Sequence, residues 1–172
     1  MQQFEPIFTD DGYRPNVGII ICNSRQQVFW ARRVRRDGWQ FPQGGIDKNE
    51  SLLDAMFREL HEETGLSKSH VRVISHTKQW LYYDLPNRFL RNQRAGTKNK
   101  KRFKGQKQIW FLLEMLAQDS RVNLKSGADT PEFDLWKWVD IEFALLNIVS
   151  FKQPVYKKAL AELSLLMPSL KA

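Results

Sequence analysis

The stretch that most constrains this chain is "GGIDKNESLLDAMFRELHEETGL", residues 44–66. Apolar residues recur in it at helical spacing, which predicts an amphipathic helix over residues 51–64. Asn49 or Ser51 is expected to cap the start of this helix, and Gly65 to end it. The residues expected to face a core are Leu52, Leu53, Met56, Phe57 and Leu60.

The same helix carries an acidic cluster. Glu59, Glu62 and Glu63 stand at i, i+3 and i+4, so their carboxylates are expected to share one patch of the helix surface. Like charges repel there, and a divalent cation would remove that repulsion. Carboxylate oxygens without a cluster of His or Cys favour Mg²⁺ or Mn²⁺ over zinc. A solvent-exposed acidic face is the alternative for such a cluster taken alone.

Three further residues around this helix are candidates for the same site. Glu50 lies at the expected helix start, where negative charge is favoured. Arg58 follows two turns later and is expected to pair with Glu50 or to orient a glutamate. Gly44 and Gly45 allow the backbone to approach a metal ion closely, so a carbonyl there is a candidate ligand.

The rest of the chain predicts one α/β domain over residues 1–172, with a core of about 11–156 and a C-terminal helix of about 154–167. Strands and helices mix without a regular βαβ rhythm, which indicates a mixed sheet between helices. The strand-like segments are residues 16–22, 28–34, 71–85, 108–116 and 135–140. The C-terminal helix is expected to begin at Pro154 and to bury Val155, Ala159, Leu163 and Leu166.

The net charge of +8 comes from one segment of the chain. Nine Lys or Arg and no acid lie from Arg88 to Lys107, so the remainder carries 8 − 9 = −1. A basic patch indicates a polyanionic partner, and a solvated loop is the alternative. No apolar run is long enough for a membrane span and no signal peptide is evident, so no membrane partner is expected. With the single Cys22 expected to be buried, the prediction is a cytoplasmic protein.

Residues 44–66 resemble the signature of the Nudix hydrolases, G-x5-E-x7-R-E-U-x-E-E-x-G-U with U aliphatic. The resemblance implies an α/β/α sandwich in which this Nudix box forms a loop, a helix and a loop. It implies hydrolysis of a nucleoside diphosphate linked to another group, with more than one Mg²⁺ or Mn²⁺ ion bound by the box glutamates, one of which also activates water. The matching residues are Gly44, Glu50, Arg58, Glu59, Leu60, Glu62, Glu63, Gly65 and Leu66.

The flanks narrow the resemblance to the bacterial RNA pyrophosphohydrolases of this family. "DGYRPNVGIIICN", "WQFPQGGI", "GQKQIWFLL", "TPEFDLWKWV" and "IVSFK" carry it, from about Asp11 to Tyr156. It implies conversion of the 5′-triphosphate or diphosphate end of RNA to a monophosphate, which initiates mRNA decay; no DNA partner is expected. A dinucleoside polyphosphate hydrolase is the alternative enzyme, and a non-catalytic RNA-binding module is the alternative from another class.

This closer resemblance also assigns roles outside the box. Glu132 in "TPEFD" would be a further metal ligand, with a loop or cap residue as the alternative. Arg14 and Arg33 would contact the 5′ phosphates, since a guanidinium pairs with two phosphate oxygens. For both arginines the alternative is an ordinary surface charge.

The RNA end would be bound by a second group of residues. The resemblance assigns Gln106 and Lys152 to this role, and Phe151 to stacking on a base, with a core aromatic as the alternative for Phe151. Trp39 and Gln40 are expected to line the same cleft.

The basic segment "NQRAGTKNKKRFK" is longer than this branch of the family leads one to expect, and it carries no motif. It would add contacts to the RNA backbone. Phe89 and Phe103 are candidates for stacking on bases or for anchoring the loop. Trp136 and Trp138 alternate with polar residues and are expected to be packing residues.

Overall fold

Two long strands form the centre of the fold. In the computed structural model, which describes residues 7–36, 38–92 and 102–168, β1 (Tyr13–Cys22) and β7 (Gly105–Met115) pair in parallel along their whole length. The middle of each strand is buried and almost entirely apolar, as "VGIIIC" in β1 shows. A strand that is covered on both faces has no polar face, so the run is continuous rather than alternating.

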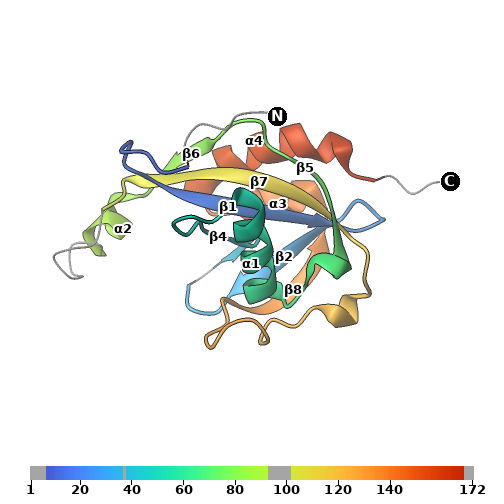
Figure 1. The fold of residues 1–172 in the computed structure, drawn as a ribbon. Helices are drawn as coiled ribbons and strands as arrows, with labels where there is room; N and C mark the ends of the chain where they lie inside the picture. The colour runs from blue at the N-terminus through green and yellow to red at the C-terminus, as the bar shows by residue number, and fades with distance from the viewer. Residues whose placement is uncertain (1–6, 37, 93–101, 169–172) are drawn as a thin grey trace.

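The remaining strands extend this pair into a mixed sheet of eight strands, with the path β3-β2-β1-β7-β5 (Figure 1). Off this path, β4 pairs with β1, β6 with β7 and β8 with β2. All pairings other than β1–β7 are antiparallel. The further strands are β2 (Val28–Arg33), β3 (Trp39–Gln40), β4 (Gln43–Gly45), β5 (Val71–His76), β6 (Leu81–Asp84) and β8 (Phe133–Val139).

Helices cover both faces of the sheet. Helix α1 (Leu52–Thr64) lies on one face, and α3 (Ile141–Asn147) and α4 (Gln153–Leu163) lie on the other (Figure 1). Alternate residues of β1 serve the two cores: Ile19 and Ile21 pack with α1, whereas Ile20 and Cys22 pack with α3 and α4. The predicted α/β/α sandwich with a mixed central sheet is confirmed.

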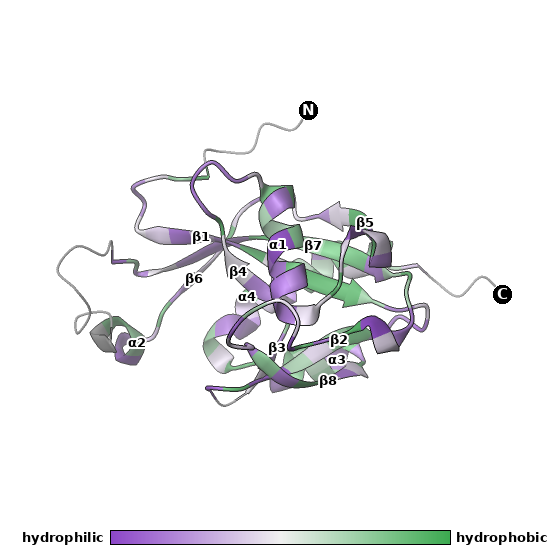
Figure 2. Cartoon of the chain, turned by 60° about the horizontal axis from the view of Figure 1, so that its bottom comes forward, coloured by the Kyte–Doolittle hydropathy of each residue, from purple (hydrophilic) through white to green (hydrophobic). Residues whose placement is uncertain are grey.

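The predicted helix of the box is confirmed with its caps. The Ser51 side chain accepts the backbone N–H of Asp54, and Gly65 ends α1 in the left-handed conformation, with φ of 72°. The predicted apolar face is partly wrong, because Leu53 is 45% exposed while Glu59 and Glu63 are buried. Figure 2 shows that α1 presents hydrophilic residues on a face turned away from the apolar stretch of β7.

Elsewhere the sequence predicted most elements correctly but not the residues at which they begin and end. Residues 71–85 form two strands, since the chain turns at Thr77, whose hydroxyl accepts the N–H of Trp110. Helix α4 ends at Leu163 and continues as a short 3₁₀ turn, so Leu166 is 50% exposed and the prediction that it is buried is wrong. Helix α3 was not predicted. A further helix, α2 (Asn87–Asn92), opens the basic segment, of which residues 93–101 lie outside the described ranges.

Side chains that the sequence assigned to packing do pack. Trp136 stacks on Phe29 with ring centroids 4.9 Å apart, Trp138 meets Phe29 edge-on, and Cys22 is buried. The prediction that residues 88–107 form one basic surface is wrong for Lys107. Its side chain is buried, and its ammonium group donates to Thr9 at 2.8 Å.

No helix in the described ranges is long and apolar enough to cross a membrane.

The close approach of β1 to β7 can be tested at Gly18. A Cβ atom at Gly18 would lie 2.4 Å from the ring of Trp110, which is fully buried and has no room to move. Gly18→Ala is therefore expected to lower the free energy of unfolding by about 3 kcal/mol, measured by urea denaturation. The exposed Ser24→Ala in the β1–β2 turn is the control, and an equal effect of both changes would contradict this packing.

Candidate active site

The acidic cluster of α1 is organised by one arginine. The Arg58 guanidinium donates to Glu59 Oε1 at 2.7 Å and lies 3.5 Å from Glu62 Oε2. It also donates to the carbonyl oxygen of Gly45 at 2.8 Å, which ties α1 to β4. Arg58 therefore fixes two of the three glutamates and the glycine loop in one arrangement.

Glu50 holds Arg58 in place. Its two carboxylate oxygens accept from Arg58 Nε at 2.8 Å and Nη2 at 2.9 Å, and one of them also accepts the backbone N–H of Asp47. Hydrogen bonding to Arg58 lowers the pKa of Glu50 below its ordinary value. The expected pairing of Arg58 with Glu50 is present, and so is the expected contact of Arg58 with a glutamate, which makes Glu50 a positioning residue here.

The glycines of β4 are required by close side-chain approaches. A Cβ atom at Gly44 would lie 1.8 Å from the carboxylate carbon of Glu59, and one at Gly45 would lie 2.4 Å from Arg14 Nη2. Any larger residue at either position would occupy space that the carboxylate or the guanidinium now fills. Gly44 and Gly45 thus bring a carboxylate and a cationic side chain against the same backbone segment.

Burial makes two of the glutamates unusual acids. Desolvation raises the pKa of Glu59 to about 7, against the opposing effect of Arg58. Desolvation, and next the neighbouring Glu59, raise the pKa of Glu63 well above its ordinary value, although Glu63 accepts the backbone N–H of Gln43 at 3.0 Å. Arg58 compensates Glu59 only in part, and Arg58 makes no hydrogen bond to Glu63, whereas Glu62 is partly exposed.

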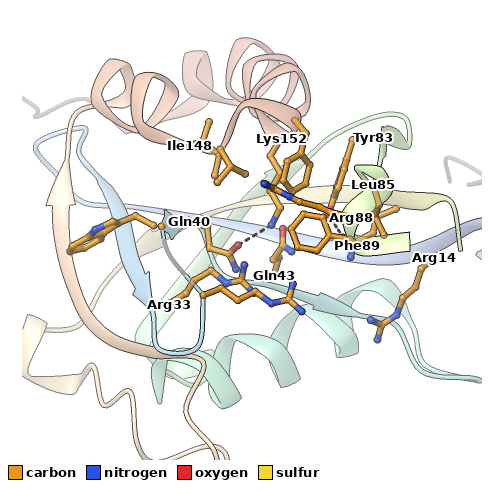
Figure 3. Close-up of a pocket in the computed structure, with 16 residues that line it drawn as sticks. Arg14, Arg33, Gln40, Gln43, Tyr83, Leu85, Arg88, Phe89, Ile148 and Lys152 are labelled. Atoms are coloured by element: carbon orange, nitrogen blue, oxygen red, sulfur yellow. Dashed lines mark hydrogen bonds between the residues drawn. The ribbon is translucent and has the colours of Figure 1, made fainter. Parts of the chain in front are cut away.

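Beside this cluster lies a pocket of about 770 Å³ (Figure 3). Every residue that the sequence assigned to substrate binding lines it, as do the two residues expected in the same cleft. Those residues are Arg14, Arg33, Gln106, Phe151, Lys152, Trp39 and Gln40. The pocket adjoins the acidic cluster through Gln43, which lines the pocket and whose backbone N–H binds Glu63.

The pocket also contains residues that the sequence did not assign to this cleft, among them Phe89, which was a candidate for stacking on bases or for anchoring the loop. Arg88 and Phe89 come from α2, and Arg36 comes from the turn after β2. The centroid of the Phe89 ring lies 5.7 Å from that of Phe151, and the guanidinium groups of Arg36 and Arg88 lie 5.6 and 4.9 Å from it. Phe89 thus belongs to the pocket wall. The sequence signals for Arg36 and Arg88 as pocket residues were the basic runs at 32–36 and from residue 88. The remaining lining residues are Gly38, Gln43, Tyr83, Leu85, Ile148 and Val149.

Lys152 is the buried polar group of the pocket. Its ammonium nitrogen donates to Gln40 Oε1 at 2.9 Å, as the dashed line in Figure 3 shows. Desolvation, and next the positive charge of Arg33, lower the pKa of Lys152 to about 7. A lysine in this state gains most from an anion that enters the pocket, because it then recovers its charge.

Glu132 and Arg33 contact each other. Arg33 Nε donates to Glu132 Oε1 at 3.0 Å, and both side chains remain partly exposed. Glu132 is also close enough to Glu63 to contribute to the rise in its pKa. The residue predicted as an additional metal ligand and a residue predicted to bind phosphate thus form an ion pair at the boundary between the acidic cluster and the pocket.

The chemistry of these side chains fits a hard divalent cation. In residues 7–36, 38–92 and 102–168, no group of three or more His, Cys, Asp or Glu side chains is already gathered as a metal site. The donors present are carboxylate oxygens, two of them buried with raised pKa values, which is the set that Mg²⁺ and Mn²⁺ prefer. A cation would add positive charge beside Glu59 and Glu63, beyond what Arg58 gives to Glu59.

Comparison with known proteins agrees with this arrangement. The family model described as NUDIX domain matches residues 12–159. The E. coli dihydroneopterin triphosphate pyrophosphohydrolase has a similar fold, with a TM-score of 0.63 at 17% identity over 85% of this chain and 95% of that chain. The C. elegans Ap4A hydrolase gives 0.58 at 18% over 84% and 93%, and the MutT protein of Methanosarcina mazei Go1 gives 0.55 at 18% over 88% and 95%.

The match to the family model covers most of the chain, so this protein belongs to the Nudix family. It is a Nudix hydrolase, an enzyme that acts on phosphoric anhydrides. Enzymes of this family generally use divalent metal ions such as Mg²⁺ or Mn²⁺.

The buried state of Lys152 predicts a pH dependence. The unfolded chain keeps this proton up to about pH 10.5, whereas the folded chain releases it near pH 7. Between these values the unfolded state binds more protons, so stability rises with pH. From pH 7 to pH 9 the wild type is therefore expected to gain about 2 kcal/mol of unfolding free energy relative to Lys152→Met, measured by urea denaturation.

Lys158→Met, which removes the same charge from the exposed face of α4, controls for net charge. A difference between wild type and Lys152→Met that stays constant from pH 7 to pH 9 would show that Lys152 keeps its proton in the folded protein.

Proposed function

We propose that this enzyme is an RNA 5′-pyrophosphohydrolase, which converts the 5′-triphosphate or diphosphate end of RNA to a monophosphate and so initiates mRNA decay. The observation that carries the proposal is the composition of the pocket beside the acidic cluster. It combines arginines, a buried lysine and aromatic rings, which together suit the phosphates and the base of a terminal nucleotide. Its volume of about 770 Å³ is in the range of small-molecule sites.

In this proposal the arginines bind the 5′ phosphates. Arg14 lies against Gly45 at the edge of the acidic cluster, and Arg33 lies at the opposite boundary beside Glu132. A polyphosphate chain between them would run past the buried carboxylates. Lys152 and Gln106 face the same pocket, so the first nucleotide meets donors on several sides.

The base would bind at the aromatic part of the pocket. Phe151 contacts Phe89 and Tyr83, with centroid distances of 5.7 and 5.9 Å, and is partly buried. Its alternative role as a core aromatic is therefore compatible with stacking, since one part of the ring packs while the pocket exposes another. Stacking tolerates any base, which suits an enzyme that acts on the ends of many RNAs.

The proposed metal ligands are Glu59, Glu62, Glu63 and Glu132, with the Gly44 carbonyl as a further candidate. Divalent ions bound by these groups would neutralise phosphate charge and lower the pKa of bound water. Glu50 and Arg58 would keep the glutamates in position, and one of the box glutamates would take the proton of the attacking water. Arg14 and Arg33 would orient the phosphates, so positioning and electrostatics supply the catalysis without a nucleophilic side chain.

A dinucleoside polyphosphate hydrolase is the second candidate. The aromatic side chains Trp39, Phe89 and Phe151 of the pocket would stack equally well on adenine, and the Ap4A hydrolase of C. elegans shares the fold. The RNA reading is favoured because the wall formed by Arg36, Arg88 and Phe89 adds positive charge beyond what the phosphates of a small substrate require.

A competition assay tests the proposed function. The purified enzyme with Mg²⁺ receives equal amounts of a 5′-triphosphorylated RNA with an unpaired end and of diadenosine tetraphosphate. The RNA is expected to be converted to its 5′-monophosphate faster, by at least about tenfold in kcat/KM, because the RNA fills both the phosphate and the base sites. Faster cleavage of the dinucleotide would replace the proposed function with the second candidate.

The metal role is tested at Glu62, the partly exposed glutamate of the cluster. Glu62→Gln keeps the shape of the side chain but removes its charge, and is expected to reduce Mg²⁺-dependent hydrolysis by about a hundredfold. Binding of a 5′-monophosphorylated RNA without metal, measured by fluorescence anisotropy, is expected to stay unchanged.

Glu142→Gln on α3 removes an equal charge from an exposed position and serves as the matched control. Full activity of Glu62→Gln would remove Glu62 from the metal site.

A further inference from the structure

A second hollow, of about 370 Å³, opens beside the pocket. It lies at the turn between β2 and β3 and shares Arg33, Arg36, Gly38 and Trp39 with the pocket, so the two cavities lie next to each other. Arg32, Val34 and Arg35 complete its lining. Among the described residues, its walls therefore carry four arginines and no acidic residue.

Backbone hydrogen bonds are made at both ends of this turn. The N–H of Arg33 donates to the carbonyl of Gly38 at 3.1 Å, and the N–H of Val34 donates to the carbonyl of Glu132 at 2.9 Å. Gly38 has φ of 110°, a conformation that other residues rarely adopt. Backbone hydrogen bonds thus hold the turn at Arg33, Val34 and Gly38, on both sides of Arg35 and Arg36.

The four arginines differ in how far their charge is already compensated. Arg32 pairs with Asp134 at 2.8 Å, and Arg33 pairs with Glu132 at 3.0 Å. Arg36 lies over the Phe89 ring. Arg35 is exposed, and within the described ranges no carboxylate pairs with Arg35 or Arg36; Asp37 of the sequence "RRVRRD" lies outside those ranges.

We propose that Arg35 and Arg36 form a second anion subsite that binds backbone phosphates of the nucleotides following the 5′ end of an RNA substrate. The inference rests on the proposed function, and it names the part of the substrate that the second hollow accepts. The ligand chemistry follows from the site: guanidinium groups bind phosphate oxygens, and a phosphodiester chain carries one negative charge per nucleotide.

The position of the second hollow directly beside the pocket is what favours a polynucleotide. A terminal nucleotide in the pocket would leave its 3′ side near the shared residues Arg36 and Trp39, and the next phosphates would meet Arg35. A free dinucleoside polyphosphate is short and has no such continuation. The subsite thus gives the enzyme a means to prefer longer RNA without reading its sequence.

The test compares short and long substrates in Arg35 variants. The substrates are a 5′-triphosphorylated dinucleotide and a 5′-triphosphorylated RNA of about 12 nucleotides with the same first two residues. Arg35→Gln is expected to lower kcat/KM for the long RNA about threefold, and Arg35→Glu by more, because one phosphate contact is lost or repelled. Both variants are expected to cleave the dinucleotide at the wild-type rate.

Salt dependence provides a second readout. The slope of log kcat/KM for the long RNA against log salt concentration is expected to become shallower by about 0.7 in Arg35→Gln, the value for one contact to a single strand. Arg25→Gln, an equal change in the exposed β1–β2 turn, is the matched control and is expected to alter neither quantity.

Two results would overturn the subsite. One is an equal effect of the Arg35 variants on both substrates, and the other is no effect on either. If the wild type leaves both triphosphorylated RNAs intact, the proposed function fails, and the subsite is then tested by binding of a 5′-monophosphorylated RNA of about 12 nucleotides, followed by fluorescence anisotropy. Equal binding by the wild type and Arg35→Glu would overturn the subsite as well.

Discussion

The ion pairs of Arg58 are the interactions on which the acidic site depends. Three glutamates crowd one end of α1, and two of them are buried, an arrangement that is unfavourable unless positive charge stands beside it. Arg58 supplies that charge and simultaneously connects α1 to β4 and to Glu50. Arg58 makes no hydrogen bond to Glu63, and within residues 7–36, 38–92 and 102–168 the hydrogen-bond donor to its carboxylate is the backbone N–H of Gln43, so Glu63 most needs a further cation.

The central sheet brings this acidic helix against a basic pocket. Arg14 comes from β1, Arg33 from β2 and Gln106 from β7, three neighbouring strands of the sheet, while β4 places Gln43 between them and α1. Helix α2 and the start of α4 close the other side. The fold therefore joins groups that can hold cations to groups that can hold anions, as hydrolysis of a metal-bound polyphosphate requires.

Much of the fold and of the acidic site could be predicted from the sequence, because the Nudix box contains both the pattern of a helix and its acidic residues at defined spacings. The caps of α1, the Glu50–Arg58 pair and the mixed sheet follow from local patterns in this way. The burial of Glu59 and Glu63 could not be predicted, since helical periodicity assigns charged residues to solvent. Tyr83 and Gln43 line the pocket because strand pairing brings distant segments together, and the same pairing buries Lys107. The sequence contains no local signal for which strands become neighbours, so these positions could not be predicted.

The ion pair of Arg33 with Glu132 would couple the proposed metal site to the proposed phosphate site. In this structure each neutralises the other, at the boundary of the cluster and the pocket. If Glu132 turns to a metal ion, Arg33 loses its partner and its guanidinium becomes available to phosphate; if phosphate binds Arg33 first, Glu132 is freed for the metal. Each ligand then lowers the free energy needed to bind the other, which is the condition for positive coupling between two sites. A single ion pair exchanged in this way would make the metal and the phosphate bind best together.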